Sequence, residues 1–206
     1  DARLPPPEAH PFPDPPRQLV FGGLAVDQSA EGRRLYNSAF LLSTTGEIVG
    51  RYDKRVLVPF GEYLPFAAQL PWLRRISPAT GHFTAGDEPG LLIAADDVRL
   101  GPLICYEDVI PGPARAAVTR GATLLLNLTN DAWYGASAEP FQHQALALWR
   151  AVETRRDFIR STNTGLTTAI SASGAVLGEL PIFVEDTLVV EARLLELTTF
   201  YTKYGD

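Results

Sequence analysis

The sequence has little of three features that often reveal a protein's class. Only one of its 206 residues is a cysteine, so no disulfide can form within the chain and cysteine usage does not indicate the compartment. Basic residues number 18 against 24 acidic ones, and the net charge of −6 leaves no basic stripe for phosphates. Apolar runs are far shorter than the roughly 20 residues of a membrane helix, and no signal peptide opens the chain. We therefore expect neither a nucleic-acid partner nor a membrane span in this chain.

Histidine is also scarce, and the three histidines lack the spacing of a metal site. His10 lies in a proline tract, His82 in a glycine-rich loop and His143 near the predicted start of a helix. We expect all three to be surface or structural residues. This disfavours both a Cys–His protease and a zinc enzyme, and neither a metal nor an organic cofactor is expected.

Proline divides the chain into two parts. Residues 1–17 hold seven prolines, which remove backbone donors and fix φ, so this segment should be extended. Residues 18–206 alternate between strand and helix patterns, which indicates one α/β domain. Turn signals at Thr45-Gly46 and Ser173-Gly174 predict two hairpins. The expected strands are residues 18–26, 36–43, 48–53, 98–104, 123–128, 166–171, 175–180 and 187–192, and the expected helices are residues 113–120 and 140–152.

The single cysteine, Cys105, stands where an apolar strand meets an acidic turn, with a predicted helix after Pro111. Such a turn exposes a nucleophile at the sheet edge, beside backbone N–H groups that can stabilise a thiolate or an oxyanion. A thiolate also needs a cation and a base. Lys54 is the best cation, and Glu62 in the following turn could accept the thiol proton. Taken alone, each residue has a simpler interpretation: a buried structural thiol, a solvated strand-end lysine and an exposed turn glutamate.

Four ordered blocks resemble the nitrilase superfamily of carbon–nitrogen hydrolases. They are YDKRVLVPFGEYLPF, GPLICYEDVIP, LLLNLTNDAWYG and QHQALALWRAVETRRDFIRSTNTG. Within that superfamily the sequences of these four blocks are most similar to the apolipoprotein N-acyltransferase family. The final TTFYTKYGD resembles the segment before that family's last membrane helix. The resemblance covers residues 19–206. It implies a four-layer α-β-β-α sandwich, possibly lacking its first strand, with residues 18–206 as the catalytic domain.

The resemblance assigns roles to individual residues. Cys105 matches the nucleophile of a Glu–Lys–Cys triad, Lys54 the catalytic lysine and Glu62 a second essential carboxylate. The residues expected to bind substrate or form the oxyanion hole are Tyr106, Glu107 and Trp133. The candidate for the triad's general base is Glu8, but the surrounding prolines leave no room for the strand and helix that place this base in the family. The alternative is that this element is absent.

The implied reaction transfers an acyl group from a phospholipid, through a thioester, to the N-terminal amine of a lipidated apolipoprotein. The implied location is the bacterial inner membrane, with the catalytic domain on its periplasmic side. The apolar loop at residues 56–76 would contact the membrane surface, although core packing is the simpler interpretation of that loop. The alternatives are a soluble amidase acting on a small amide and a catalytically impaired fragment. Four arginines are expected to form a solvated or salt-bridged face: Arg150, Arg155, Arg156 and Arg160.

Overall fold

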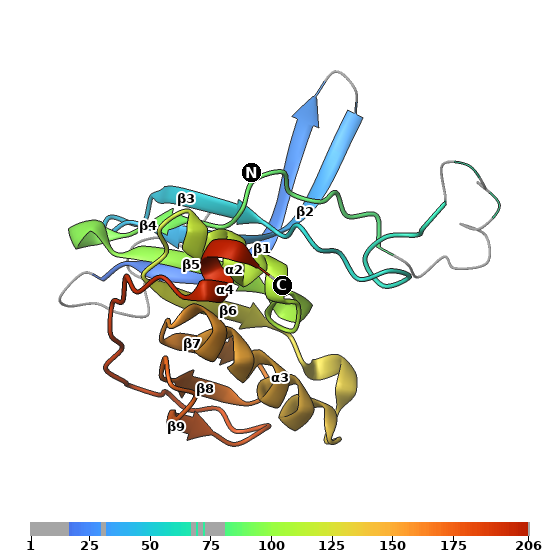
Figure 1. Cartoon of the computed structure of the whole chain (residues 1–206). Coiled ribbons are helices and arrows are strands. Elements are labelled where there is room, and N and C mark those ends of the chain that lie inside the picture. Colours follow the sequence, from blue (N-terminus) through green and yellow to red (C-terminus); the bar gives the residue numbers. More distant parts are fainter. Residues whose placement is uncertain (1–16, 30–31, 67–68, 70–71, 73–80, 206) are drawn as a thin grey trace.

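The computed structural model describes residues 17–29, 32–66, 69, 72 and 81–205 (Figure 1). The first sheet has three antiparallel strands in the order β1-β2-β3. They are β1 (Leu19–Ser29), β2 (Gly32–Leu42) and β3 (Ile48–Asp53). The expected hairpin around Thr45-Gly46 is confirmed, since β2 and β3 pair directly on either side of it. Apart from Arg17, the proline-rich segment expected at residues 1–17 lies outside the described residues.

The second sheet has six strands in the order β4-β5-β6-β7-β8-β9. They are β4 (Leu92–Ile93), β5 (Arg99–Ile104), β6 (Leu124–Thr129), β7 (Phe158–Thr162), β8 (Thr167–Ile170) and β9 (Val176–Leu180). The three central strands, β5, β6 and β7, are parallel, so their carboxyl ends meet at one edge. In open α/β sheets this edge is where ligands bind.

Helices α2 (Pro111–Thr119) and α3 (Glu139–Thr154) connect the parallel strands. Short helical turns follow two of the strand ends: η3 (Cys105–Asp108) after β5 and η4 (Ala132–Tyr134) after β6. The remaining described helical segments are η2 (Ala95–Asp97) and α4 (Phe200–Tyr204). In the described part of the chain, no helix is long and apolar enough to cross a membrane.

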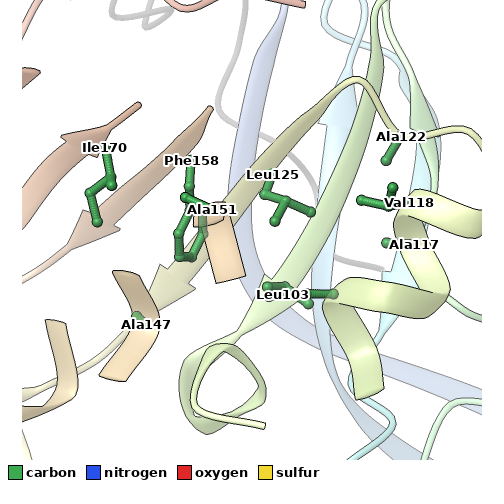
Figure 2. Packing of buried hydrophobic residues seen from close by; sticks show 10 residues of the cluster. Leu103, Ala117, Val118, Ala122, Leu125, Ala147, Ala151, Phe158 and Ile170 are labelled. Carbon is green, nitrogen blue, oxygen red and sulfur yellow. The ribbon is translucent and has the colours of Figure 1, made fainter. Parts of the chain in front are cut away.

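Two apolar clusters hold these elements together. In the first, small residues of α2 and α3 pack against the six-stranded sheet around Leu103, Leu125 and Phe158, all fully buried (Figure 2). In the second, Leu41 of the first sheet contacts residues of the other sheet such as Ile104. Because side chains alternate along a strand, Leu103 and Ile104 point to opposite faces of β5 and serve different clusters. The expected mixed α/β class is confirmed.

Two details differ from the sequence prediction. The strand expected at residues 187–192 is wrong, because that segment joins neither sheet. Its Leu188 and Val190 lie beside Gly178 of β9, so they give a strand-like apolar pattern through packing alone. Strand β7 was not predicted, because three polar residues, including the buried Arg160, interrupt its apolar pattern.

Candidate active site

Cys105 begins the η3 turn directly after β5, as the sequence predicted. Its φ of 50° lies in the left-handed region, which is unfavourable for a residue with a side chain. The side-chain amide of Asn127, on the neighbouring strand β6, donates a hydrogen bond of 3.0 Å to the Cys105 carbonyl and helps to hold this turn. The thiol is partly buried at the carboxyl edge of the parallel strands.

Lys54 follows β3 directly and is almost fully buried, with 1% of its surface exposed. Its ammonium forms an ion pair of 2.7 Å with Oε2 of Glu62. The same oxygen accepts a hydrogen bond from the backbone N–H of Val58, and Oε1 accepts one from the side-chain amide of Asn37. Both oxygens of Glu62 are therefore engaged, and the arrangement fixes the ammonium in place.

The positive charge of Lys54 affects the pKa of the Cys105 thiol. Burial raises the pKa of this thiol above its ordinary value, while Lys54, the Thr129 hydroxyl and the Tyr106 backbone N–H act in the opposite direction. Burial is the larger effect, so the thiol is not ionised by its surroundings alone. A separate proton acceptor is therefore needed for thiolate chemistry.

Glu107 is fully buried and joins the two halves of the site. Its carboxylate accepts hydrogen bonds from the Tyr52 hydroxyl and from the backbone N–H groups of Arg55, Val56 and Ile104. Burial raises the pKa of Glu107 even though these donors favour its charged form. The carboxylate thus connects the chain beside Lys54 to the chain before Cys105.

Tyr106 and Trp133 are exposed, with 45% and 86% of their surfaces accessible. Tyr106 follows the cysteine directly, and Trp133 lies in η4 beside Tyr134. Burial raises the pKa of Tyr134, as do the charges of Glu139 and, less strongly, Cys105. Both aromatic side chains are therefore free to meet a substrate.

A second charged cluster lies near Cys105, and the sequence analysis did not find it. Asp108, three residues after the cysteine, forms an ion pair of 3.0 Å with Arg160 and accepts a hydrogen bond of 2.6 Å from Nε2 of His143. The other ring nitrogen, Nδ1, lies 3.5 Å from Oδ1 of Asp131. That oxygen also accepts a hydrogen bond of 3.1 Å from the Thr129 hydroxyl.

This cluster corrects the interpretation of the arginines. Arg160 is fully buried, and Arg150 and Arg156 are nearly so. Arg150 pairs with Glu153, whereas Arg156 donates to backbone carbonyls. Ion pairs are confirmed for Arg150 and Arg160, whereas a solvated position is wrong for all three buried residues. His82 is exposed and His143 is buried beside Asp108, so both agree with the expectation of surface or structural residues.

Ligand atoms of Asp131, Glu139 and His143 lie within 4.8 Å of one another, a spacing that could hold a metal ion. Burial disfavours the charged imidazole, but the hydrogen bond to Asp108 and the nearby carboxylate of Asp131 outweigh this and raise the pKa of His143 to about 9. With the ring protonated, the cluster forms a network of paired charges.

Two expected features fall partly outside the described residues. Glu8, the candidate base, lies outside them, as do most positions of the 56–76 loop after Phe66. In the described part of that loop Phe60, Phe66 and Trp72 are exposed, whereas Leu64 is buried.

Comparisons with known proteins identify the family of this fold. The model of the carbon-nitrogen hydrolase family matches residues 17–200, and the chain belongs to this family. The chain is similar to apolipoprotein N-acyltransferases: 44% identical over 190 residues to that of Geobacter metallireducens and 36% identical over 198 residues to that of Bdellovibrio bacteriovorus. These alignments cover 91% and 92% of this chain. The chain spans about a third, 36%, of the length of each relative.

Solved structures point to the same fold. A mutant of the amidase from Nesterenkonia sp. AN1, in which acrylamide has added to the active-site cysteine, is 25% identical with a TM-score of 0.56; the match covers 81% of this chain and 60% of that one. A carbon-nitrogen hydrolase from Helicobacter pylori G27 is 18% identical with a TM-score of 0.60, over the same shares of the two chains.

Proposed function

We propose that this chain is the catalytic domain of an N-acyltransferase that moves a fatty acyl group from a phospholipid to the N-terminal amine of a lipidated apolipoprotein. The observation that carries the proposal is the buried Lys54–Glu62 ion pair beside Cys105, in a chain 44% identical over 190 residues to an apolipoprotein N-acyltransferase.

In the first step the thiolate of Cys105 attacks the ester carbonyl of the phospholipid. A C–S bond forms, the ester C–O bond breaks, and the leaving alkoxide takes the proton that the base removed from the thiol, giving a lysophospholipid. The ammonium of Lys54 and the backbone N–H of Tyr106 stabilise the oxyanion, because both already act on the sulfur.

In the second step the free amine attacks the thioester carbonyl. The C–N bond of the amide forms, the C–S bond breaks, and the base carries the single proton lost by the amine to the departing thiolate. Glu8 is the candidate base. Glu62 instead positions Lys54, because both of its oxygens already accept hydrogen bonds.

The proposed complete fold is the four-layer α-β-β-α sandwich, possibly without its first strand. Exposed aromatic residues at Phe60, Phe66 and Trp72 support the proposal that the 56–76 loop meets a membrane surface, with the domain on the periplasmic side of the inner membrane. Trp133 and Tyr106 offer further exposed aromatic surface for the substrates.

A second candidate function is amide hydrolysis, in which water replaces the amine. It is favoured by the similarity to the Nesterenkonia amidase. The two functions share Cys105 and Lys54 and differ in the acyl donor and acceptor.

The deciding experiment supplies both kinds of substrate to the chain and to a Cys105→Ala control. We expect a labelled acyl chain to pass from phospholipid to the amine of a lipidated peptide, as measured by mass spectrometry of the peptide. Release of ammonia from small amides, with no labelled peptide, would establish the amidase instead.

A further inference from the structure

We propose that Asn37 is a positioning residue of the active site, whose side-chain amide orients the Glu62 carboxylate so that this carboxylate holds the Lys54 ammonium in place. The inference rests on the proposed function and deepens it, since it concerns the same ion pair. Its first test measures how firmly Lys54 is held and needs no acyl transfer.

Asn37 is an unusual residue for its place in the fold. It lies in β2, the central strand of the three-stranded sheet, and asparagine is depleted in strands. Its partly buried amide donates a hydrogen bond of 3.1 Å to Oε1 of Glu62, which is 25 residues further along the chain. The amide nitrogen faces the carboxylate, because the amide oxygen is itself an acceptor and would be repelled. A residue that departs from strand preference and contacts a distant carboxylate in this way indicates a role for its side chain.

Asn37 contacts both members of the ion pair, each through a different part of the residue. Its backbone carbonyl accepts a hydrogen bond of 2.8 Å from the backbone N–H of Lys54, and its side chain holds Glu62. The other donors to the carboxylate, the Lys54 ammonium and the Val58 N–H, both bind Oε2. They fix one oxygen only, so the amide on Oε1 sets the rotation of the carboxylate plane. That rotation decides where the ammonium is held.

The backbone around Glu62 is held independently of the Asn37 side chain. The carbonyl of Glu62 accepts a hydrogen bond of 3.0 Å from the N–H of Phe83, and Phe83 forms a bridge with Leu35 of β2. The bond from the Lys54 N–H to β2 uses a backbone carbonyl, which any residue at position 37 provides. Substitution of the Asn37 side chain should therefore loosen the carboxylate without displacing the chain that carries it.

The protein has only two lysines, Lys54 and the exposed Lys203, so the second is an internal reference for the first. The experiment treats the native protein with a trace of acetic anhydride and compares acetylation of the two lysines by peptide mass spectrometry. An amine held as a buried ammonium reacts slowly. Asn37→Leu keeps the approximate size but removes the donor, and we expect the ratio of Lys54 to Lys203 acetylation to rise about tenfold, the effect of losing one hydrogen bond to a charged group.

A matched control is available in Gln144, whose partly buried amide also donates to a glutamate carboxylate, that of Glu179, at 2.8 Å. Gln144→Leu removes the same kind of hydrogen bond between α3 and β9 and should leave the acetylation ratio unchanged. An unchanged ratio in Asn37→Leu, or an equal rise in Gln144→Leu, would overturn the proposal.

The rate of Cys105 acylation by an activated ester gives the second readout. Asn37→Leu should lower the maximal rate about tenfold without changing the ester concentration that gives half of it, because the amide acts on a charge used in the transition state. In the Glu62→Gln background the same substitution should add little, since Asn37 acts through the carboxylate. Fully additive losses would overturn the proposal.

Two further measurements keep the proposal testable if Asn37→Leu does not fold. Asn37→Ala removes the amide from a smaller side chain and should give the same rise in the acetylation ratio. In the wild-type protein, NMR should show that the Asn37 side-chain amide protons exchange slowly with water, and exchange at the rate of a free amide would contradict the proposal. Failure of the proposed function would look different, since the acetylation ratios would still shift while no acyl group passed from phospholipid to a lipidated peptide.

Discussion

Two charged regions near Cys105 are built differently. In the first, Lys54 and Glu62 form a single ion pair on the chain that follows the three-stranded sheet. In the second, Asp108, His143 and Arg160 belong to a buried network formed by residues from three elements of the six-stranded half. The charge of Lys54 favours the Cys105 thiolate, whereas the charge of Asp108 disfavours it.

The two regions can therefore contribute differently to the rate of the reaction and to the stability of the domain. An ammonium held beside the reacting atoms stabilises charge as it develops, which changes the rate directly. A balanced network adds little net charge, but it fixes geometry and ties the site to the stability of the domain. Substitutions in the first region should therefore lower activity most, and substitutions in the second should change ionisation and stability.

The largest effect is expected for Lys54. Lys54→Ala should lower acylation of Cys105 by about 10²–10³-fold, the cost of losing an oxyanion-stabilising group. Lys54→Arg should also fail, because the planar guanidinium does not reproduce a compact charge in this buried space. Acylation rates with an activated ester measure both. Near-normal rates would mean that Lys54 is not part of the reaction.

The next largest effect on acylation is expected for Glu62. Glu62→Gln keeps the shape but removes the charge that fixes Lys54, and misplacing a catalytic group costs on the order of 10²-fold. Glu185→Gln, on an exposed glutamate, is the control. Glu62→Gln should also impair acylation more than Glu8→Gln; the reverse order would make Glu8 the more important carboxylate.

The second region should make the free energy of unfolding depend on pH. The folded pKa of His143, about 9, lies above the ordinary value of 6.5, so its contribution is complete below about pH 6.5 and is lost as the pH rises through about 9. At about 1.4 kcal/mol per pKa unit, the free energy of unfolding should fall by about 3 kcal/mol across this window.

Urea unfolding at pH 6, 7.5 and 9 measures this fall. Burial also raises the pKa of Cys105, which contributes a loss in the same direction at higher pH, so His143→Gln is needed for comparison. That variant should be less stable at pH 6 and nearly independent of pH up to about 8. An equally steep fall in His143→Gln would assign the effect to other groups.

The smallest effect on stability is expected at Trp133. Because 86% of its surface is exposed, Trp133→Ala should change the free energy of unfolding by less than about 0.5 kcal/mol. Acylation by phospholipid should nevertheless fall several-fold, while acylation by a small activated ester should not change. If Trp133→Ala and the wild-type protein are acylated by phospholipid at equal rates, Trp133 does not belong to the substrate-binding surface.

The two regions also differ in how far the sequence predicted them. Lys54 and Cys105 each follow a strand that the apolar pattern predicts, so their positions could be inferred from strand ends. The charged network could not, because burial of Arg160 and His143 depends on partners that are 52 and 35 residues from them, respectively, along the chain. A charged side chain normally indicates a surface, and only its tertiary partners reverse that expectation.

The fold shows the same limit. Strands in which apolar residues predominate, such as β5 and β6, were predicted within a residue or two of their observed ends. The short apolar run at residues 187–192 was misleading, since Leu188 and Val190 pack on β9 without pairing within a sheet. The apolar pattern alone does not distinguish a paired strand from a segment that only packs on a sheet.

The central claim is that Cys105 is the nucleophile and that Lys54 equips it for acyl transfer. The most direct test incubates the chain with a labelled phospholipid or an activated ester and maps the acyl group by peptide mass spectrometry. We expect one acyl group on Cys105, released by hydroxylamine as a thioester should be, and almost none in Lys54→Ala. Turnover of either substrate with Cys105 unmodified, or equal labelling of the Lys54→Ala variant, would contradict the account.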